Sequence, residues 1–434
     1  MERAIRQLIL RLLTGERALV FTRTVPTREA LRAKLARIDA FGLYLHIPFC
    51  EQICPYCPYN KERYRDNLAE RYVAALITEM DFYSEIIGKK PVTSLYIGGG
   101  TPTTMLDCGL DKIIGHIRDV FNLQCDIHME SHPNHLSADN LGRIKALGVQ
   151  HLSLGVEALF DRHLKFLGRP YTADGAKEAV RRAVAAGFKC VNVDVMFALP
   201  GQTYEEIETT GRELVKLGVD QIAAYPLFRF PHTPLGRAHP AQNHVLFQSL
   251  KRRRMLRILE NIFYQARYER TSAWAFTRRG IPRYCSVTVP LYLGLGASGG
   301  SYLKDVFYLN TFGVAEYINA IEERGRAVAL SIDLTAKMQR AGWLYWRIYE
   351  TRFAKVEYQE RFGEDLDRAY GRYLWILKRL GCLRDDGERI TLSDRGAFWL
   401  HAGEDILSID YISKLWGASR REQWPEKSRI GRTH

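Results

Sequence analysis

The stretch Tyr44-Leu-His-Ile-Pro-Phe-Cys50-Glu-Gln-Ile-Cys54-Pro-Tyr-Cys57 puts three cysteines within eight residues, directly after the apolar, strand-like run 42–47. Three thiolates on one short loop can hold iron, although iron–sulfur clusters usually take four cysteines. The next cysteine, Cys108, is far away in the sequence. A cluster on three thiolates leaves one iron open, and an open metal position is where a substrate or cosubstrate binds.

Two other interpretations of the triplet are a structural zinc site and three buried thiols. Zinc needs a fourth ligand, and no pair of Cys or His residues with suitable spacing follows nearby. We therefore favour the iron–sulfur cluster.

The composition of the 434 residues predicts a folded protein with one large and one smaller domain, since 46% are hydrophobic. No apolar run is long enough to span a membrane. Residues 1–13 have apolar residues at helical spacing and no cleavage site, so we expect an amphipathic helix rather than a signal peptide. Eight cysteines without a secreted disulfide pattern, and a cluster that needs reducing conditions, indicate the cytoplasm.

The net charge of +13 (62 basic minus 49 acidic residues) is compatible with nucleic acid, a membrane surface or an acidic small substrate. No nucleic-acid motif accompanies the charge, so we expect no nucleic-acid partner. A polycarboxylate substrate fits, and a solvated basic face is the alternative.

Strand-like and helical stretches alternate from residue 42, which predicts βα units and a parallel sheet. The expected strands are 42–47, 93–97, 125–130, 150–155, 190–197 and 221–227, and the expected helices between them are 65–87, 109–121, 138–147, 173–187 and 203–217. Six such units predict a partial (β/α)6 barrel of the TIM type, with catalytic groups at the carboxyl ends of its strands.

Polar motifs stand at those strand ends. Gly98–Gly100 follows the second strand, and adjacent glycines can offer backbone N–H groups to a carboxylate or phosphate. Glu130, Glu157 and Asp194 lie on or at the end of apolar strands, where buried acids need partners. Together they favour a polar site on the barrel rim.

The spacing Cys-x3-Cys-x2-Cys, with Tyr56 before the last cysteine, resembles the signature of radical S-adenosylmethionine (SAM) enzymes. The order of the motifs is similar to that of the oxygen-independent coproporphyrinogen III oxidase family, which also holds heme chaperones, heme-degrading enzymes and methyltransferases that use two SAM molecules. The matching motifs are 44–50, Gly98–Pro102, Gly155–Glu157, Leu167–Arg169, Asp194 with Leu199–Gly201, Thr233–Leu235 and Leu293–Gly296.

The resemblance implies a [4Fe–4S] cluster on Cys50, Cys54 and Cys57, with SAM on the open iron. Tyr44, the backbone of Gly99 and Glu130 match contacts to that SAM. Contacts that reach a second SAM in the oxidase match Tyr56, Gly100, Thr101, Glu157, Arg169 and Asp194. Tyr56 is also the candidate catalytic residue, and the match near Phe228 and Gly300 is looser.

The resemblance also implies a substrate and a reaction. The substrate would be an acidic tetrapyrrole such as coproporphyrinogen III, the reaction an oxidative decarboxylation, and the electron donor a flavodoxin or ferredoxin. Three departures bear on this reading: Pro58 replaces a further cysteine of the oxidase, Glu157 replaces Gln, and Gly300 replaces a larger apolar residue. A methyltransferase or cyclopropanating enzyme using two SAM molecules, and a heme chaperone, are the alternatives.

The remaining segments give the domain plan. We expect a basic helical segment at 1–41, the barrel with a connecting region at 42–300, a small helical module at 301–405 and a basic tail at 406–434, loosely ordered beyond Trp416. Two helices, a hairpin at 382–392 and a last helix capped by Ser393 make the module winged-helix-like. In the family such a module covers the substrate opening. His232 is a candidate heme ligand or proton shuttle, and Cys285 a candidate reactive cysteine.

Overall fold

A parallel sheet forms the centre of the protein. The computed structural model describes residues 11–430 apart from 12–13, 17, 25, 240–244 and 284–290, so the helix expected at 1–13 and Cys285 lie outside the described residues. The parallel strands follow the order β10-β9-β8-β7-β5-β2-β13. Their bounds are β2 Phe41–Ile47, β5 Pro91–Gly99, β7 Ile127–Ser131, β8 Val149–Glu157, β9 Cys190–Phe197, β10 Gln221–Pro226 and β13 Tyr292–Leu295.

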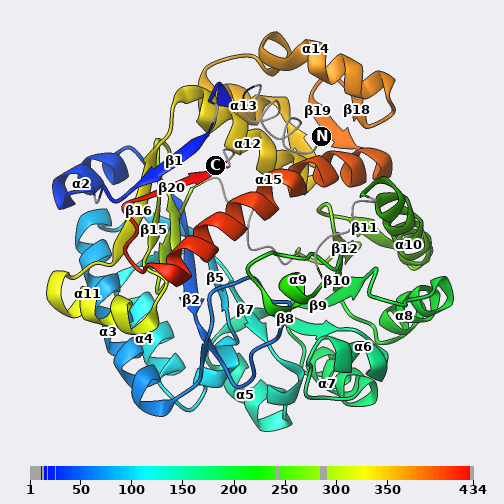
Figure 1. Ribbon diagram of the computed structural model, residues 1–434, viewed down its shortest axis with the longest axis horizontal. Coiled ribbons are helices and arrows are strands. Elements are labelled where there is room, and N and C mark those ends of the chain that lie inside the picture. Colours follow the sequence, from blue (N-terminus) through cyan, green and yellow to red (C-terminus); the bar gives the residue numbers. More distant parts are fainter. Residues whose placement is uncertain are drawn as a thin grey trace.

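All six strands expected from the alternation are present, and β13 adds a parallel partner to β2 that the pattern did not predict. Helices lie outside the curved sheet, as Figure 1 shows, which gives the expected partial α/β barrel. They are α3 Asp66–Ile87, α4 Leu110–Val120, α5 Ala138–Ala146, α6 Asp161–Phe166, α7 Ala173–Ala185 and α8 Tyr204–Lys216. Ser137, Thr172 and Thr203 cap three of them through side-chain oxygens.

The sheet continues beyond the parallel strands at both edges. Antiparallel strands β12 (Ala275–Arg278) and β11 (Tyr268–Arg270) follow β10. Beyond β13 come β14 (Gly300–Tyr302), β15 (Val306–Asn310), β16 (Val328–Asp333), β1 (Leu19–Thr22) and β20 (Lys427–Ile430). The smaller elements are β3 Phe49–Cys50, β4 Glu62–Arg63, β6 Asn122–Leu123, η1 Pro102–Met105, η2 Pro133–His135, α2 Arg28–Ala36, α9 Pro234–Ala238, α10 Val245–Gln265 and α11 Val314–Arg324.

The expectation of a loosely ordered tail beyond Trp416 is wrong for the described residues. Helix α15 runs from Asp394 to Arg421, and β20 then pairs with β1 over four residues. Ser428 and Ile430 of β20 are buried, and Ile430 packs in the same apolar cluster as Phe21. The domain plan remains a prediction, but its boundary at 300/301 falls inside β14 and that at 405/406 falls inside α15.

The C-terminal module has the winged-helix-like order that the sequence predicted. It consists of α12 (Ala336–Glu350), β17 (Arg352–Ala354), α13 (Lys355–Phe362), α14 (Leu366–Arg379), β18 (Leu383–Asp385), β19 (Arg389–Leu392) and α15. The hairpin turns where it was expected, while β17 and helix α13 are additions that the sequence pattern did not predict. In Figure 1, α15 crosses in front of the barrel strands.

None of the described helices combines the length and apolar character that crossing a membrane requires.

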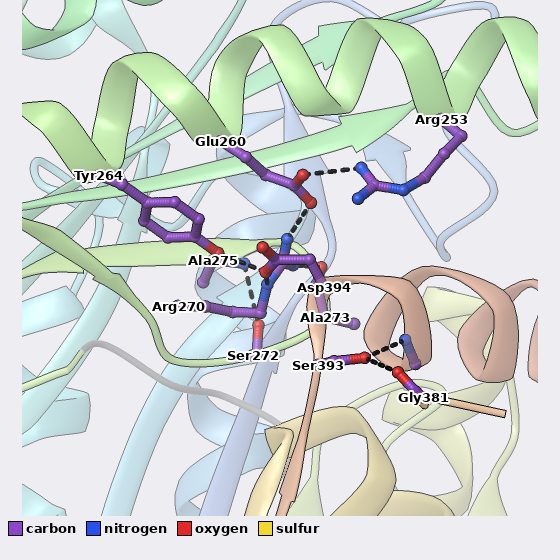
Figure 2. A network of polar contacts seen from close by, with 11 residues as sticks. Arg253, Glu260, Tyr264, Arg270, Ser272, Ala273, Ala275, Gly381, Ser393 and Asp394 are labelled. Carbon is purple, nitrogen blue, oxygen red and sulfur yellow. Dashed lines mark hydrogen bonds and ion pairs between the residues drawn. The ribbon is translucent and has the colours of Figure 1, made fainter. Parts of the chain in front are cut away.

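A buried polar network joins this module to the barrel, as Figure 2 shows. Glu260 of α10 is 2% exposed and pairs with Arg253 and Arg270. Arg270 also donates through Nε to Asp394 at the start of α15, 3.1 Å away, and the Tyr264 hydroxyl donates to the same carboxylate. The position of α15 therefore depends on charges supplied by α10 and β11.

Candidate active site

One cavity of about 580 Å³ opens at the carboxyl ends of the parallel strands. Its lining includes all but one of the site residues expected from the sequence: Cys50, Cys54, Tyr56, Cys57, Gly99, Gly100, Thr101, Glu130, Glu157, Arg169 and Asp194. This is where a parallel barrel places its catalytic groups, because the loops that follow its strands meet there.

The three thiols belong to the loop that follows β2. Cys50 ends β3, and Cys54 and Cys57 follow on the loop; none of the three is in a disulfide. The Thr101 hydroxyl lies 3.7 Å from the Cys50 sulfur, and Arg169 Nη1 lies 3.3 Å from the Cys54 sulfur. Hydrogen-bond donors that point at the sulfur atoms stabilise the negatively charged thiolate form. Without a metal, burial raises the pKa of Cys50 to about 12.

No three His, Cys, Asp or Glu side chains of the described residues are placed to bind one and the same metal ion. That finding does not test a cluster, because each cysteine then binds a different iron. The donor set of three unpaired thiols on one loop, lining a cavity with an arginine and a threonine at the sulfurs, fits a cluster.

The glycine loop after β5 lies tightly against the cysteine loop. Gly99 has φ of +121°, and a Cβ there would lie 2.6 Å from the His46 ring, so glycine is required. The Gly99 N–H donates to Glu130 and the Gly100 N–H to the Ile47 carbonyl, at 2.9 and 2.7 Å. These N–H groups are thus bonded within the protein, not free for an anion as the motif suggested. The Tyr96 hydroxyl donates to the other oxygen of Glu130.

Arg169 and Glu157 connect the cysteine loop to the end of β8. Arg169 Nη2 donates to the Gly155 carbonyl at 2.6 Å, and Nη1 lies 3.5 Å from the Tyr56 hydroxyl. Glu157 has φ of +68°, a conformation that non-glycine residues rarely adopt, and accepts from the Tyr225 hydroxyl at 2.9 Å. Burial raises the pKa of Glu157, while Arg169 and the tyrosine hydroxyls oppose the shift.

Asp194 is held on β9 by two neutral donors. The Ser153 hydroxyl and the Asn192 amide each lie 2.9 Å from one of its oxygens. Burial, and then the negative charge of Glu157, raise the pKa of Asp194 to about 7. No cation of the protein is among these hydrogen-bond partners, so the carboxylate is placed to receive a cationic ligand.

Tyr44 is the expected site residue that does not line the cavity. Its ring stacks on Tyr96, which does, and its hydroxyl lies 2.8 Å from Nδ1 of His46. Since His46 Nε2 lies 3.0 Å from the Asn60 carbonyl and must donate to it, Nδ1 accepts from Tyr44. Tyr44 is therefore fixed next to the cavity wall.

His232, a candidate heme ligand or proton shuttle, makes a contact within the protein. Its Nε2 lies 3.0 Å from the carbonyl oxygen of Pro58, and it is not part of the cavity lining. The bond ties the loop after β10 to the residue that follows the cysteine triplet. A heme ligand at this position would have to give up that bond.

The rest of the cavity wall contains residues that were not expected from the sequence. Trp274 comes from the turn before β12, Tyr345 and Tyr349 from α12, and His401, Ile409 and Ile412 from α15. His401 packs between Trp274 and Tyr349, at ring-centroid distances of 5.1 and 5.3 Å. Phe228, matched only loosely, also lines the cavity. The expectation that the module covers the opening was the one available signal for this wall.

One family model matches the part of the chain that carries this site. The model of the radical SAM superfamily matches residues 44–214, which contain the three thiols and Glu130, Glu157 and Asp194. Residues 44–214 are a radical SAM domain. Radical SAM proteins use a [4Fe–4S] cluster and SAM, so Cys50, Cys54 and Cys57 are the residues available to hold the cluster here.

Two curated relatives and one solved structure are similar to this chain beyond the radical SAM domain. It is 28% identical to the heme chaperone HemW of Bacillus subtilis over 81% of this chain and 95% of the relative. It is 27% identical to the oxygen-independent coproporphyrinogen III oxidase of Salmonella typhimurium over 68% of each. The structure of Escherichia coli coproporphyrinogen III oxidase HemN has the same fold, with a TM-score of 0.75 at 22% identity over 90% of this chain and 94% of that one.

Proposed function

We propose that this protein is a radical SAM enzyme that binds two SAM molecules in its cavity and acts on a tetrapyrrole. When bound and reduced, the cluster cleaves SAM and supplies a 5′-deoxyadenosyl radical that takes a hydrogen atom from the substrate. The observation that carries the proposal is the placement of Glu157 and Asp194 in the same cavity as the three thiols.

The charges of the described lining favour cationic ligands. Its acidic residues are Glu51, Glu130, Glu157 and Asp194, and its basic residues are Lys61, Arg169 and Arg283. Each of the three basic side chains already bonds to the protein: Lys61 to the Cys57 carbonyl, Arg169 to the Gly155 carbonyl and Arg283 to Glu350. SAM carries a sulfonium and an ammonium group, so a second SAM suits Glu157 and Asp194, with Arg169 near its carboxylate.

The same charges bear on the reaction. Coproporphyrinogen III carries four carboxylates and would need cationic partners, which the described lining supplies sparingly. We therefore propose that the reaction is the transfer of a one-carbon group from the second SAM, in preference to an oxidative decarboxylation. The tetrapyrrole substrate class rests on the names of the relatives, a heme chaperone and a coproporphyrinogen III oxidase.

We propose that Tyr56 acts as a neutral hydrogen-bond donor at the boundary between the two ligands. Burial, and then the charge of Glu157, raise the pKa of its phenol well above the usual value, so it keeps its proton at neutral pH. Its hydroxyl lies near Arg169, on the loop that carries Cys54 and Cys57. From there it can orient the second ligand toward the cluster.

A second candidate function is heme trafficking. The observation in its favour is that the match to the Bacillus subtilis heme chaperone extends over 95% of that protein. In that case the cavity would bind heme stoichiometrically and SAM cleavage would not convert it.

The test is an anaerobic assay of reconstituted protein, reduced by flavodoxin or ferredoxin, with SAM and either coproporphyrinogen III or heme. S-adenosylhomocysteine formed together with 5′-deoxyadenosine and a methylated tetrapyrrole supports the proposal. Protoporphyrinogen without S-adenosylhomocysteine would show the oxidase reaction instead. Tight heme binding with no converted tetrapyrrole would show the chaperone.

A further inference from the structure

Helix α14 of the C-terminal module carries an exposed apolar surface that its own fold does not use. Tyr373, Trp375, Ile376 and Leu380 are 55%, 57%, 40% and 51% exposed. The opposite side of the helix faces the apolar core of the module through Tyr370, Leu374 and Leu377. Tyr373, Ile376 and Leu380 are spaced three and four residues apart and form one exposed strip, and Trp375 lies on the other side of Ile376. Solvent-exposed apolar side chains are normal singly, but this grouping marks an interaction surface.

Basic residues are interleaved with this patch. From 368 to 384 the chain has Arg368, Arg372, Lys378, Arg379 and Arg384 and no acidic residue. Arg368, Arg372, Trp375 and Arg379 follow one another at spacings of four, three and four residues, so they lie along one line of the helix. The Arg379 guanidinium lies 4.8 Å from the centre of the Trp375 ring.

We define the α14 face as Arg368, Arg372, Trp375, Ile376 and Arg379, and we propose that it binds the surface of an anionic lipid bilayer. Tryptophan favours the boundary between headgroups and acyl chains, where the ring is in an apolar environment and its polar edge is hydrated. Arginines beside it pair with anionic headgroups while their stems stay in apolar contact.

The positive charge of the α14 face, together with its apolar side chains, favours an anionic membrane over nucleic acid. Each Lys or Arg close to an anionic membrane strengthens binding about fivefold. Duplex nucleic acid, the usual partner of a basic winged helix, also offers phosphates, but it is contacted mainly through polar and charged side chains. It would leave Trp375 and Ile376 without apolar partners.

The position of α14 suits contact with a surface. Figure 1 shows α14 at the edge of the molecule, in the module whose α12 and α15 complete the cavity wall. A bilayer on the α14 face would therefore lie next to the element that closes the cavity, which suits an apolar substrate that partitions into membranes. The surface proposal itself does not depend on the proposed reaction.

The test is cosedimentation of the full-length holoprotein with vesicles of phosphatidylcholine alone and of phosphatidylcholine mixed with phosphatidylglycerol. We expect binding to the anionic vesicles that weakens as salt is raised. Trp375→Ser combined with Ile376→Ser should reduce it more than tenfold, and Arg372→Glu combined with Arg379→Glu should abolish the preference for anionic lipid. Leu250→Ser, at a 53% exposed leucine on α10, is the matched control and should bind normally.

Circular dichroism and SAM cleavage without substrate show that each variant is folded. Equal binding to both kinds of vesicle, or binding unchanged by the double serine variant, overturns the proposal. A third outcome also overturns it: the protein binds no vesicle but binds duplex DNA in a salt-dependent way that the arginine substitutions remove. The α14 face would then be a nucleic-acid surface.

Discussion

The two walls of the cavity are built in different ways. The barrel wall, with the thiols and Glu130, Glu157 and Asp194, consists of side chains that strands place at one rim and that hydrogen bonds fix from their neighbours. The module wall, with Tyr349 and His401 among its members, consists mainly of aromatic and apolar side chains that reach the cavity and Trp274 only when α12 and α15 dock. The first wall suits cofactor chemistry that is common to a superfamily, and the second suits the choice of substrate.

The largest effect is expected from a substitution in the barrel wall that removes a cluster ligand. Cys50→Ala should remove the brown colour of the reconstituted cluster and all 5′-deoxyadenosine formation, because a cluster cannot be held by two thiolates on this loop. Visible absorbance and nucleoside analysis after anaerobic reconstitution measure both. Cys108→Ala, at a cysteine outside the cavity lining, is the control. An unchanged spectrum in Cys50→Ala would remove the cluster assignment.

The next effect separates the two walls. Arg270→Leu leaves buried Glu260 with one cationic partner and Asp394 without its guanidinium, and breaking a buried pair of this kind costs about 3 kcal/mol. Urea unfolding should show this loss, and proteolysis should cut first around α15. Arg279→Leu removes a pair in which the arginine is 78% exposed and should change stability by less than about 0.5 kcal/mol. Equal effects of the two variants would mean that the network does not hold the module.

A smaller effect sharpens the assignment within the barrel wall. Asp194→Asn should weaken binding of the second SAM about tenfold, corresponding to roughly 1.4 kcal/mol, and leave the cluster-bound SAM unaffected. Equilibrium dialysis with and without the cluster separates the two sites. Glu208→Gln, on the outside of α8, should bind both normally.

The pKa of Asp194 predicts that ligand binding depends on pH. Its pKa in the ligand-free protein is about 7, and a cationic ligand needs the ionised form, so affinity should rise about tenfold from pH 6 to pH 8. Asp194→Asn should abolish this rise. For stability the sign is opposite: a carboxyl whose folded pKa lies above its unfolded value of 3.8 loses stability as pH rises from about 4 to 7.

The smallest effect is expected from a substitution in the module wall. His401→Leu removes ring contacts with Trp274 and Tyr349 that are worth about 0.5–1.5 kcal/mol, so the KM for the tetrapyrrole should rise roughly 2- to 10-fold. SAM cleavage without substrate should be unchanged, because the barrel wall is intact. A parallel loss of substrate-free cleavage would show that the two walls are not independent.

The difference between the walls also explains what could be predicted. Cys50 was expected from the spacing of the three cysteines, and Glu130 and Asp194 because they are acids on or near the end of apolar strands. Trp274 and His401 were missed because they lie 127 residues apart on a turn and a helix, and no spacing relates them. The pairing of β1 with β20 was missed for the same reason: two four-residue strands separated by about 400 residues leave no local pattern.

The late position of α15 in the chain has a consequence for assembly of the holoprotein. Cys57 leaves the ribosome 355 residues before Ile412 (412 minus 57), which at 5–20 residues per second is about 20–70 s. In the later part of that interval, after Arg169 and His232 have emerged, the cysteine loop can be folded while the module wall does not yet exist. The iron–sulfur assembly machinery therefore has a period of open access to the thiols during translation, and α15 closes over a site that can already be loaded.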